Sequence, residues 1–346
     1  MLSFKGFQAG VNLGGWISQY HHFDEGHFNR FITQADIQLI ASWGMDHIRL
    51  PFDYPVLEDD DHPFAYRQAG LTHLDNCIHW CDQAGLNLIL DLHKAPGYFF
   101  GTFNETTLFT HPQTRERFLR LWEMLAERYH GVNPNGLVFE LLNEMVQPTS
   151  DPWNELAHEA FARIRSTDPT RWVMVGGNNY NSAWTLKEIE LIDDPRVVYT
   201  FHFYEPMPFT HQRARWVPAL LALDAVTPYP GMAPGLEEFL ASHPEHSQGL
   251  EKFLSTPMDR DYLIANLKPA LAFQRQSGAP LYCGEYGAID HAPRESRLNW
   301  HRDFIGLLRD HNIGRAVWSY KEMNFRLVNK VGEIESQELI DIVSQI

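Results

Sequence analysis

The sequence predicts a (β/α)8 TIM barrel, a ring of eight parallel strands surrounded by helices. Three observations lead to this fold class. Eight short apolar runs recur along the 346 residues, helical patterns lie between them, and polar side chains gather where the runs end. Apolar runs bounded by Gly, Pro or Asp are typical of parallel strands, which are buried on both faces. A doubly wound three-layer sheet uses the same alternation and is the alternative.

The eight apolar runs have the length of single strands and are separated by turn residues. Each is rich in Val, Ile, Leu and aromatic residues, as buried strands are. We therefore expect one barrel strand in each run. In chain order the runs are 7–13, 45–50, 86–92, 137–143, 171–177, 197–203, 280–285 and 314–320.

Amphipathic helical patterns fill most of the intervals between these runs. The segment 33–44 begins with a Thr in capping position and ends at Gly, and the segment 71–84 keeps an apolar stripe and stops before Gly85. The same period continues in 111–130, 152–167 and 294–312. We expect these five segments to be helices that cover the outside of the barrel.

One connection is too long for an ordinary barrel loop. It follows the sixth predicted strand and covers about 205–260. We expect a small helical subdomain there, placed above the carboxyl ends of the strands, where the loops of such barrels project. The whole chain, 1–346, is otherwise expected to form a single catalytic domain.

The composition of the chain favours a neutral partner over a negatively charged one. With 28 Lys and Arg against 44 Asp and Glu the net charge is -16, which opposes binding to nucleic acid or to anionic membranes. The aromatic share of 13% can supply stacking surfaces for a neutral polysaccharide. The start of the chain has no signal-peptide pattern, so we expect a cytoplasmic monomer, although a secreted chain trimmed of its leader would look the same. Cys77, Cys81 and Cys283 are expected to be reduced core thiols.

Polar side chains stand at the ends of six predicted strands. In a barrel of parallel strands the carboxyl ends converge on one pocket, so these side chains are expected to meet. They are Arg49, His93, Asn143, Glu144, His202, Tyr204, Glu285 and Trp318.

Two of these residues, Glu144 and Glu285, lie on nearly opposite strands and fit the two carboxyl groups of glycoside hydrolysis. We interpret Glu144 as the acid/base and Glu285 as the nucleophile, with Arg49 and the Tyr204 hydroxyl keeping Glu285 ionised. A spacing near 5.5 Å would give retention of configuration. Asn143 suits the sugar 2-hydroxyl, His93 and His202 offer further polar contacts, and Trp318 offers a flat ring to the sugar.

This set resembles the Arg, His, Asn-Glu, His-x-Tyr, Glu and Trp pattern of glycoside hydrolase family 5 in clan A, and the likeness covers nearly the whole chain. The resemblance implies a retaining endo-β-glucanase without metal or cofactor, acting on β-1,4-glucan or mixed β-1,3/1,4-glucan. It also implies glucose-binding subsites. Their candidates are Asn12, Trp16, Asn179, Trp216, Asn324 and Phe325, with Asn324 standing where the family pattern leads us to expect Asp.

Other functions remain open at this point. An exo-β-glucanase, a β-glucosidase or a β-mannanase uses the same catalytic pair, because the surrounding loops select the polymer. A non-catalytic glucan-binding barrel would keep the aromatic residues. A metal-dependent hydrolase is the third alternative, but His21, His22 and the acidic residues 59–61 do not form a ligand pattern that suits one.

Overall fold

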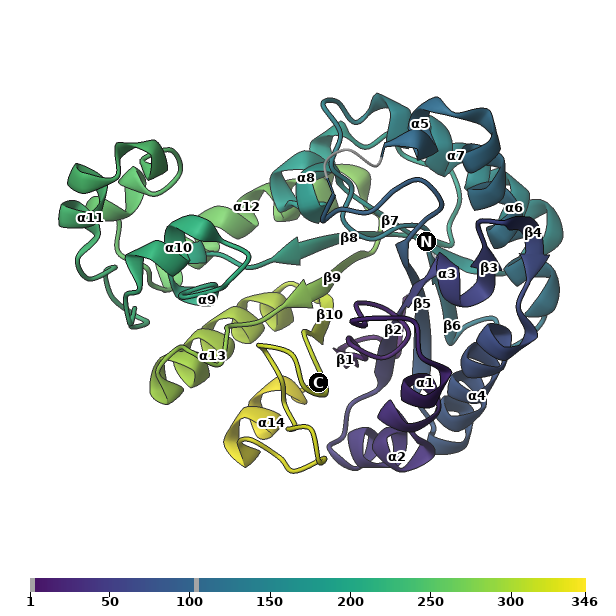
Figure 1. Cartoon of the computed structure of the whole chain (residues 1–346), viewed down its shortest axis with the longest axis horizontal. Coiled ribbons are helices and arrows are strands. Elements are labelled where there is room, and N and C mark those ends of the chain that lie inside the picture. The colour runs from purple at the N-terminus through teal and green to yellow at the C-terminus, as the bar shows by residue number, and fades with distance from the viewer. Residues whose placement is uncertain (1–3, 103–105) are drawn as a thin grey trace.

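Eight parallel strands close into a barrel in the computed structural model, which describes residues 4–102 and 106–346 (Figure 1). Around the ring the order is β1-β10-β9-β8-β7-β6-β5-β2. The predicted (β/α)8 fold is confirmed, and each of the eight apolar runs contains one strand. The strands are β1 (Ala9–Asn12), β2 (His47–Asp53), β5 (Asn87–Lys94), β6 (Leu137–Glu140), β7 (Trp172–Gly176), β8 (Val197–Phe203), β9 (Leu281–Tyr286) and β10 (Gly314–Val317).

The period of two along each strand separates an inner from an outer core. On β5, Leu88, Leu90 and Leu92 belong to the large outer core under the helices, whereas Ile89 belongs to a small separate cluster. That cluster also takes residues from β6, β7, β8, β9 and β10 and therefore lies inside the barrel. Two residues further along β5 the inward position is Asp91, which is fully buried. The barrel interior thus changes from apolar to charged towards the carboxyl ends of the strands.

Helices surround this ring where the sequence predicts them (Figure 1). The Thr33 side chain and Asp36 form a capping box at the start of α2, and Gly85 ends α4 with a left-handed φ of 72°. All five predicted helices are present. They are α2 (Gln34–Ser42), α4 (Gln68–Ala84), α6 (Pro112–Arg128), α7 (Asp151–Thr167) and α13 (Arg294–Asp310).

Shorter elements complete the wall, and one long helix, α12 (Arg260–Ser277), follows the insertion. A capping Asp259 side chain accepts the backbone N–H of Tyr262 at its start. Among the described residues, no helix combines the length and the apolar character that a membrane span needs. The shorter elements are α1 (Glu25–Phe31), α3 (Tyr54–Leu57), α5 (Thr107–Thr110), α8 (Asn178–Asn181), η1 (Ala183–Glu188) and α14 (Gln337–Val343).

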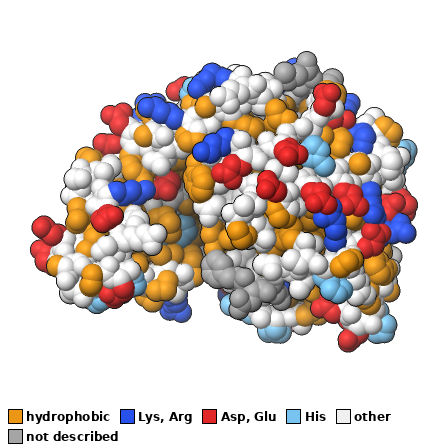
Figure 2. All heavy atoms as spheres, turned by 90° about the horizontal axis from the view of Figure 1, so that it is seen from above, with side chains coloured by type: hydrophobic (Ala, Val, Ile, Leu, Met, Phe, Trp, Pro, Cys, Tyr) orange, Lys and Arg blue, Asp and Glu red, His pale blue; other side chains and the backbone are white. Residues whose placement is uncertain are grey.

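The long connection between β8 and α12 forms a group of short helices at one side of the barrel, on the left in Figures 1 and 2. Phe239 and Phe253 are buried there, and the Tyr229 hydroxyl donates to Asp303 of α13 at 2.9 Å. On the face in Figure 2, acidic and basic side chains are interspersed. The helices are α9 (Met207–Thr210), α10 (Pro218–Leu223), α11 (Leu236–Ser242), η2 (Pro244–His246) and η3 (Glu251–Leu254).

A hairpin of β3 (Glu58–Asp59) and β4 (His62–Tyr66) follows the second barrel strand and was not predicted. The acidic stretch 59–61 forms its turn. Arg117 pairs with two carboxylates of this hairpin, with Glu58 at 3.1 Å and with Asp60 at 2.8 Å. Single-sequence periodicity misses a hairpin this short because it has too few alternating positions.

Candidate active site

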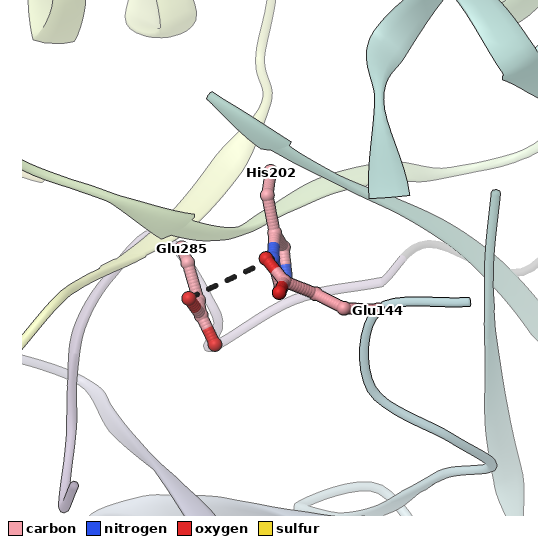
Figure 3. A group of neighbouring side chains, drawn as sticks. All are labelled: Glu144, His202 and Glu285. Atoms are coloured by element: carbon pink, nitrogen blue, oxygen red, sulfur yellow. Dashed lines mark hydrogen bonds and ion pairs between the residues drawn. The ribbon is translucent and has the colours of Figure 1, made fainter. Parts of the chain in front are cut away.

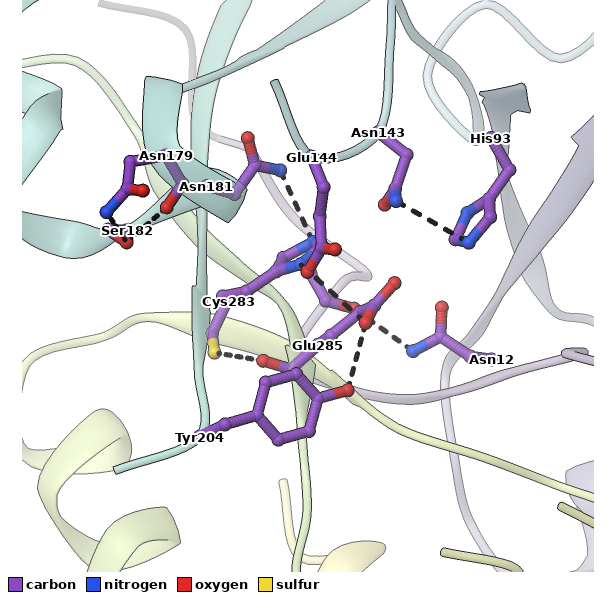
Figure 4. Close-up of polar contacts among 12 residues, drawn as sticks. Asn12, His93, Asn143, Glu144, Asn179, Asn181, Ser182, Tyr204, Cys283 and Glu285 are labelled. Carbon is purple, nitrogen blue, oxygen red and sulfur yellow. Dashed lines mark hydrogen bonds and ion pairs between the residues drawn. The ribbon is translucent and has the colours of Figure 1, made fainter. Parts of the chain in front are cut away.

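The strand-end residues meet above the charged part of the barrel interior (Figure 4). Hydrogen bonds, together with the 3.6 Å contact between His202 and Glu285, connect seven of the eight predicted residues into one network, and Trp318 joins it by stacking on His93, with ring centroids 5.7 Å apart. The seven are Arg49, His93, Asn143, Glu144, His202, Tyr204 and Glu285.

Two carboxyl groups face each other in this network. Glu285 lies on β9, and Glu144 follows β6 with an unusual positive φ of 29°. A carboxylate oxygen of each, together with a ring nitrogen of His202, lie within 4.8 Å of one another (Figure 3). This separation suits direct attack by one carboxylate, as in retaining enzymes, and is shorter than the roughly 6.5–9.5 Å by which inverting enzymes make room for an attacking water.

Arg49 is the only fully buried cation in contact with the pair among the described residues. Its Nη1 donates to Glu285 at 2.9 Å and to the Asn12 amide oxygen at 2.8 Å. Its Nε and Nη2 donate to both oxygens of Glu140, at 2.7 and 2.9 Å, and Nη2 also lies 3.0 Å from Asp91. This fork-shaped pairing fixes the guanidinium in one orientation, so that one N–H points at Glu285.

The environments of the two carboxyl groups differ. Burial raises the pKa of Glu144 well above its ordinary value, and the negative charge of Glu285 raises it further. Burial also raises the pKa of Glu285, but Arg49 and the hydrogen bond from the Tyr204 hydroxyl, at 2.9 Å, oppose this rise. The proton shared by the pair therefore stays on Glu144 while Glu285 is ionised.

His93 connects Arg49 with Trp318 and does not touch either glutamate. Its Nδ1 lies 2.7 Å from Asp91 and its Nε2 lies 2.9 Å from the Gln19 amide nitrogen. Burial lowers the pKa of His93 to about 4 and raises the pKa of Asp91 to about 7. His93 is therefore a neutral ring near pH 7, and it supports the stacked Trp318 from one side.

Asp91 and Glu140 contact Arg49 in the candidate site, and the sequence analysis did not identify them. Both are completely buried and occupy paired positions on β5 and β6. The sequence does carry a signal for them. Asp91 interrupts an apolar strand two residues before His93, and so lies on the same face of the strand. Glu140 interrupts the next strand three residues before Asn143, near the strand end that holds the site.

Two predicted subsite residues are corrected by the structure. Trp16 is fully buried and its indole N–H donates to the Phe28 carbonyl at 2.7 Å, so no sugar can reach its ring. Asn12 is also fully buried. Its amide accepts from Arg49 and donates to backbone carbonyls of Gly284 and Ala316, so all of its hydrogen-bonding groups are used within the barrel.

The other predicted subsite residues lie around the mouth of the barrel. Trp216 is 52% exposed, and its ring lies 6.3 Å from that of Phe325, which is buried beside Trp318. Asn179 is half-buried in the loop after β7, and Asn324 is half-buried in the loop after β10. Trp216 is thus the predicted subsite residue with the largest surface available to a ligand.

The same centre is where a metal ion could be held. Within the described parts of the chain, one group of three or more acidic, His or Cys ligands is close enough to hold an ion, and it consists of Glu144, His202 and Glu285. Two of its three members are the catalytic candidates. A metal at this position would occupy the oxygens that acid/base and nucleophilic chemistry need.

Known proteins of one glycosidase family resemble this chain. The chain matches the family model Cellulase (glycosyl hydrolase family 5) over residues 6–324. It is 46% identical over 345 residues to Endoglucanase C of Acetivibrio thermocellus, with 100% of this chain and 99% of that protein covered. Cellodextrinase A of Ruminococcus flavefaciens is 35% identical over 317 residues, with 91% and 86% covered.

Solved structures share the fold. A hyperthermophilic endo-β-1,4-glucanase in complex with substrate superposes with a TM-score of 0.77 at 21% identity, covering 99% of this chain and 98% of that one. Thermotoga maritima Cel5A in complex with cellobiose superposes with a TM-score of 0.76 at 23% identity, covering 98% of each chain.

Proposed function

The chain belongs to glycosyl hydrolase family 5 and is a retaining endoglucanase, and we propose that it cleaves β-1,4-glucan or mixed β-1,3/1,4-glucan with Glu144 as acid/base and Glu285 as nucleophile. One observation carries the assignment of roles. The two carboxyl groups lie within 4.8 Å, yet of the two only Glu285 receives hydrogen bonds from Arg49 and Tyr204 among the described residues. The two carboxyl groups are therefore close enough for direct attack, and their environments differ enough for one to act as acid and the other as nucleophile.

The first step makes a covalent intermediate. A carboxylate oxygen of Glu285 attacks the anomeric carbon, while Glu144 gives its proton to the departing glycosidic oxygen. The bond from the anomeric carbon to that oxygen breaks and an ester to Glu285 forms. Asn143, whose amide oxygen accepts from Arg49 at 2.9 Å, presents its amide nitrogen to the sugar 2-hydroxyl.

The second step returns the enzyme to its starting state. Once Glu285 is a neutral ester, its charge no longer raises the pKa of Glu144, and Glu144 can take a proton from water. The water oxygen attacks the anomeric carbon and the ester bond to Glu285 breaks. Two displacements at one carbon retain its configuration.

The experiment is reducing-sugar release from barley mixed-linkage glucan, carboxymethylcellulose, laminarin and glucomannan. Glu144→Gln and Glu285→Gln should each lose about 10²- to 10⁴-fold or more of the rate. Glu155→Gln is the matched control, because this side chain is 75% exposed and pairs with Arg115 on the outer helices, away from the site. Variants of both catalytic candidates that remain as active as the parent would refute the mechanism, and activity confined to laminarin or glucomannan would refute the substrate.

Action on short chains is a second candidate, favoured by the relative named Cellodextrinase A. The insertion beside the barrel carries the exposed Trp216, and a wall at this end of the site would favour release of mono- or disaccharides. Viscosity separates the two modes. Endo-cleavage of a soluble glucan lowers viscosity long before reducing ends accumulate, whereas exo-action releases short sugars while viscosity persists.

A further inference from the structure

The loop after β7, which contains the short element α8, holds an unusual backbone conformation beside the catalytic acid. Asn179, Tyr180 and Asn181 follow one another with φ of 48°, 60° and 53°. Side chains of L residues disfavour this left-handed region, most of all one as bulky as Tyr. A run of three such residues persists only where surrounding contacts hold it, and such places are frequently functional.

The contacts that hold this loop lead to the backbone of the catalytic acid. Tyr180 N–H donates to the Met145 carbonyl at 2.9 Å, and the Asn178 side chain exchanges two hydrogen bonds with the Gln147 backbone, both 2.9 Å. Met145 and Gln147 are the first and third residues after Glu144. These hydrogen bonds fix the strained loop to the backbone that follows Glu144.

This backbone conformation places the side chain of Asn181 beside the ring of His202. It is fully buried, and its Nδ2 lies 3.3 Å from Nε2 of His202 (Figure 4). On the other side of the ring, Nδ1 of His202 lies 2.8 Å from Oε1 of Glu144. Asn181 and Glu144 thus contact the two nitrogens of one imidazole.

The protonation of that imidazole follows from its partners. Burial lowers the pKa of His202 well below its ordinary value, so the ring is neutral and carries one N–H. An amide nitrogen can only donate, so Nε2 must be the acceptor. The single proton is therefore on Nδ1 and is donated to Glu144.

We propose that Asn181 is a positioning residue that holds His202 in its Nδ1–H form and thereby selects which oxygen of Glu144 carries the reactive proton. Because Oε1 accepts from His202, the proton of the neutral carboxyl group resides on Oε2. After Oε2 gives up this proton, the same hydrogen bond stabilises the carboxylate that acts as base. This inference rests on the proposed role of Glu144 as the acid/base.

The test uses two aryl β-cellobiosides that differ in leaving group. Asn181→Asp keeps the shape of the side chain but places an acceptor opposite Nε2, which removes the proton from Nδ1 or charges the ring. We expect kcat/KM for phenyl β-cellobioside to fall on the order of tenfold to a hundredfold, and kcat/KM for 2,4-dinitrophenyl β-cellobioside to stay within about threefold. Only the first leaving group needs a proton from the enzyme in the step that kcat/KM reports.

Asn154 provides the matched control. It is a buried Asn on α7 whose side chain, among the residues that the structure describes, bonds only the backbone of Glu188 and Glu190. Asn154→Asp should change both substrates equally. An equal loss on both substrates in Asn181→Asp, or no loss, would overturn the proposal for Asn181. A parent chain inactive on both cellobiosides would instead count against the proposed function.

Nitrogen-15 NMR of the histidine rings in the parent protein decides the tautomer without requiring activity or a folded Asn181 variant. The His202 signals are assigned by their absence in His202→Gln. A protonated Nδ1 and an unprotonated Nε2 are the expected result near neutral pH. A protonated Nε2 would overturn the proposal, whatever the kinetics of the Asn181 variants.

Discussion

Arg49→Met is the substitution whose effect can be worked out most fully from the structure. Two unit charges about 4 Å apart interact by about 4 kcal/mol at an effective dielectric constant of 20. Arg49 and Glu285 are buried and their atoms lie 2.9 Å apart, so the loss of this pair is of that order. A change of about 4 kcal/mol in the energy of the ionised nucleophile corresponds to about a thousandfold in kcat/KM near neutral pH.

The pH profile of kcat/KM is the assay. Glu285 must be ionised in the free enzyme, so its pKa sets the acid limb, and Glu144 must be protonated, so its pKa sets the basic limb. Without Arg49, nothing of comparable strength opposes the rise in the pKa of Glu285 that burial causes. The acid limb should therefore move to higher pH, towards the basic limb, and the maximum should fall.

Arg171→Met is the control for stability. Arg171 is equally buried and pairs with Asp168 at 2.9 Å, but it donates to the carbonyl of Leu137, at the opposite end of the barrel. Breaking either buried pair should lower the free energy of unfolding by about 3–5 kcal/mol. Only Arg49→Met should move the acid limb, measured under conditions where both variants are folded. An acid limb that stays in place in Arg49→Met would refute the electrostatic role of Arg49.

Three further changes test other parts of the site. Trp216→Ala should raise KM for polymeric glucan while changing the free energy of unfolding by less than about 0.5 kcal/mol, because the ring is 52% exposed; an unchanged KM in steady-state assays would exclude it from the subsites. Trp16→Ala should lower the free energy of unfolding by about 3–5 kcal/mol in urea titrations with KM unchanged, and a selective rise in KM would restore it as a subsite. Prolonged EDTA treatment should leave activity intact; loss that a divalent ion reverses would place a metal between Glu144, His202 and Glu285.

The sequence was sufficient to predict that the candidate site residues meet, because the topology of a parallel barrel brings the carboxyl ends of its strands together. Once eight strands are recognised, every polar residue at a carboxyl end is placed in one pocket, whatever its separation along the chain. Arg49, Glu144 and Glu285 lie far apart in sequence and meet for this reason. No contact between side chains had to be predicted to bring them together.

The features that the sequence did not predict depend on the direction of a side chain or on the conformation of the backbone. A Trp four residues after a strand, such as Trp16, has the same sequence pattern whether its ring faces the ligand or the core. Periodicity says nothing about a left-handed backbone at Tyr180 or Asn181, since neither is Gly. Asp91 and Glu140 were overlooked because a charge inside an apolar run is expensive unless paired, and the pairing with Arg49 appears only in three dimensions.

The buried charges also explain how the site can support both steps without rearrangement. In the proposed mechanism the negative charge is on Glu285 before attack and on Glu144 after the ester forms, so the number of charges in the pocket stays constant. His202 lies between the two positions, with Nδ1 2.8 Å from Glu144 and 3.6 Å from Glu285. Its N–H can therefore stabilise the charge in either place with a small change of angle. Arg49, held by Glu140, cannot turn to follow the charge, so its attraction favours the ionised nucleophile and drives the return from the ester.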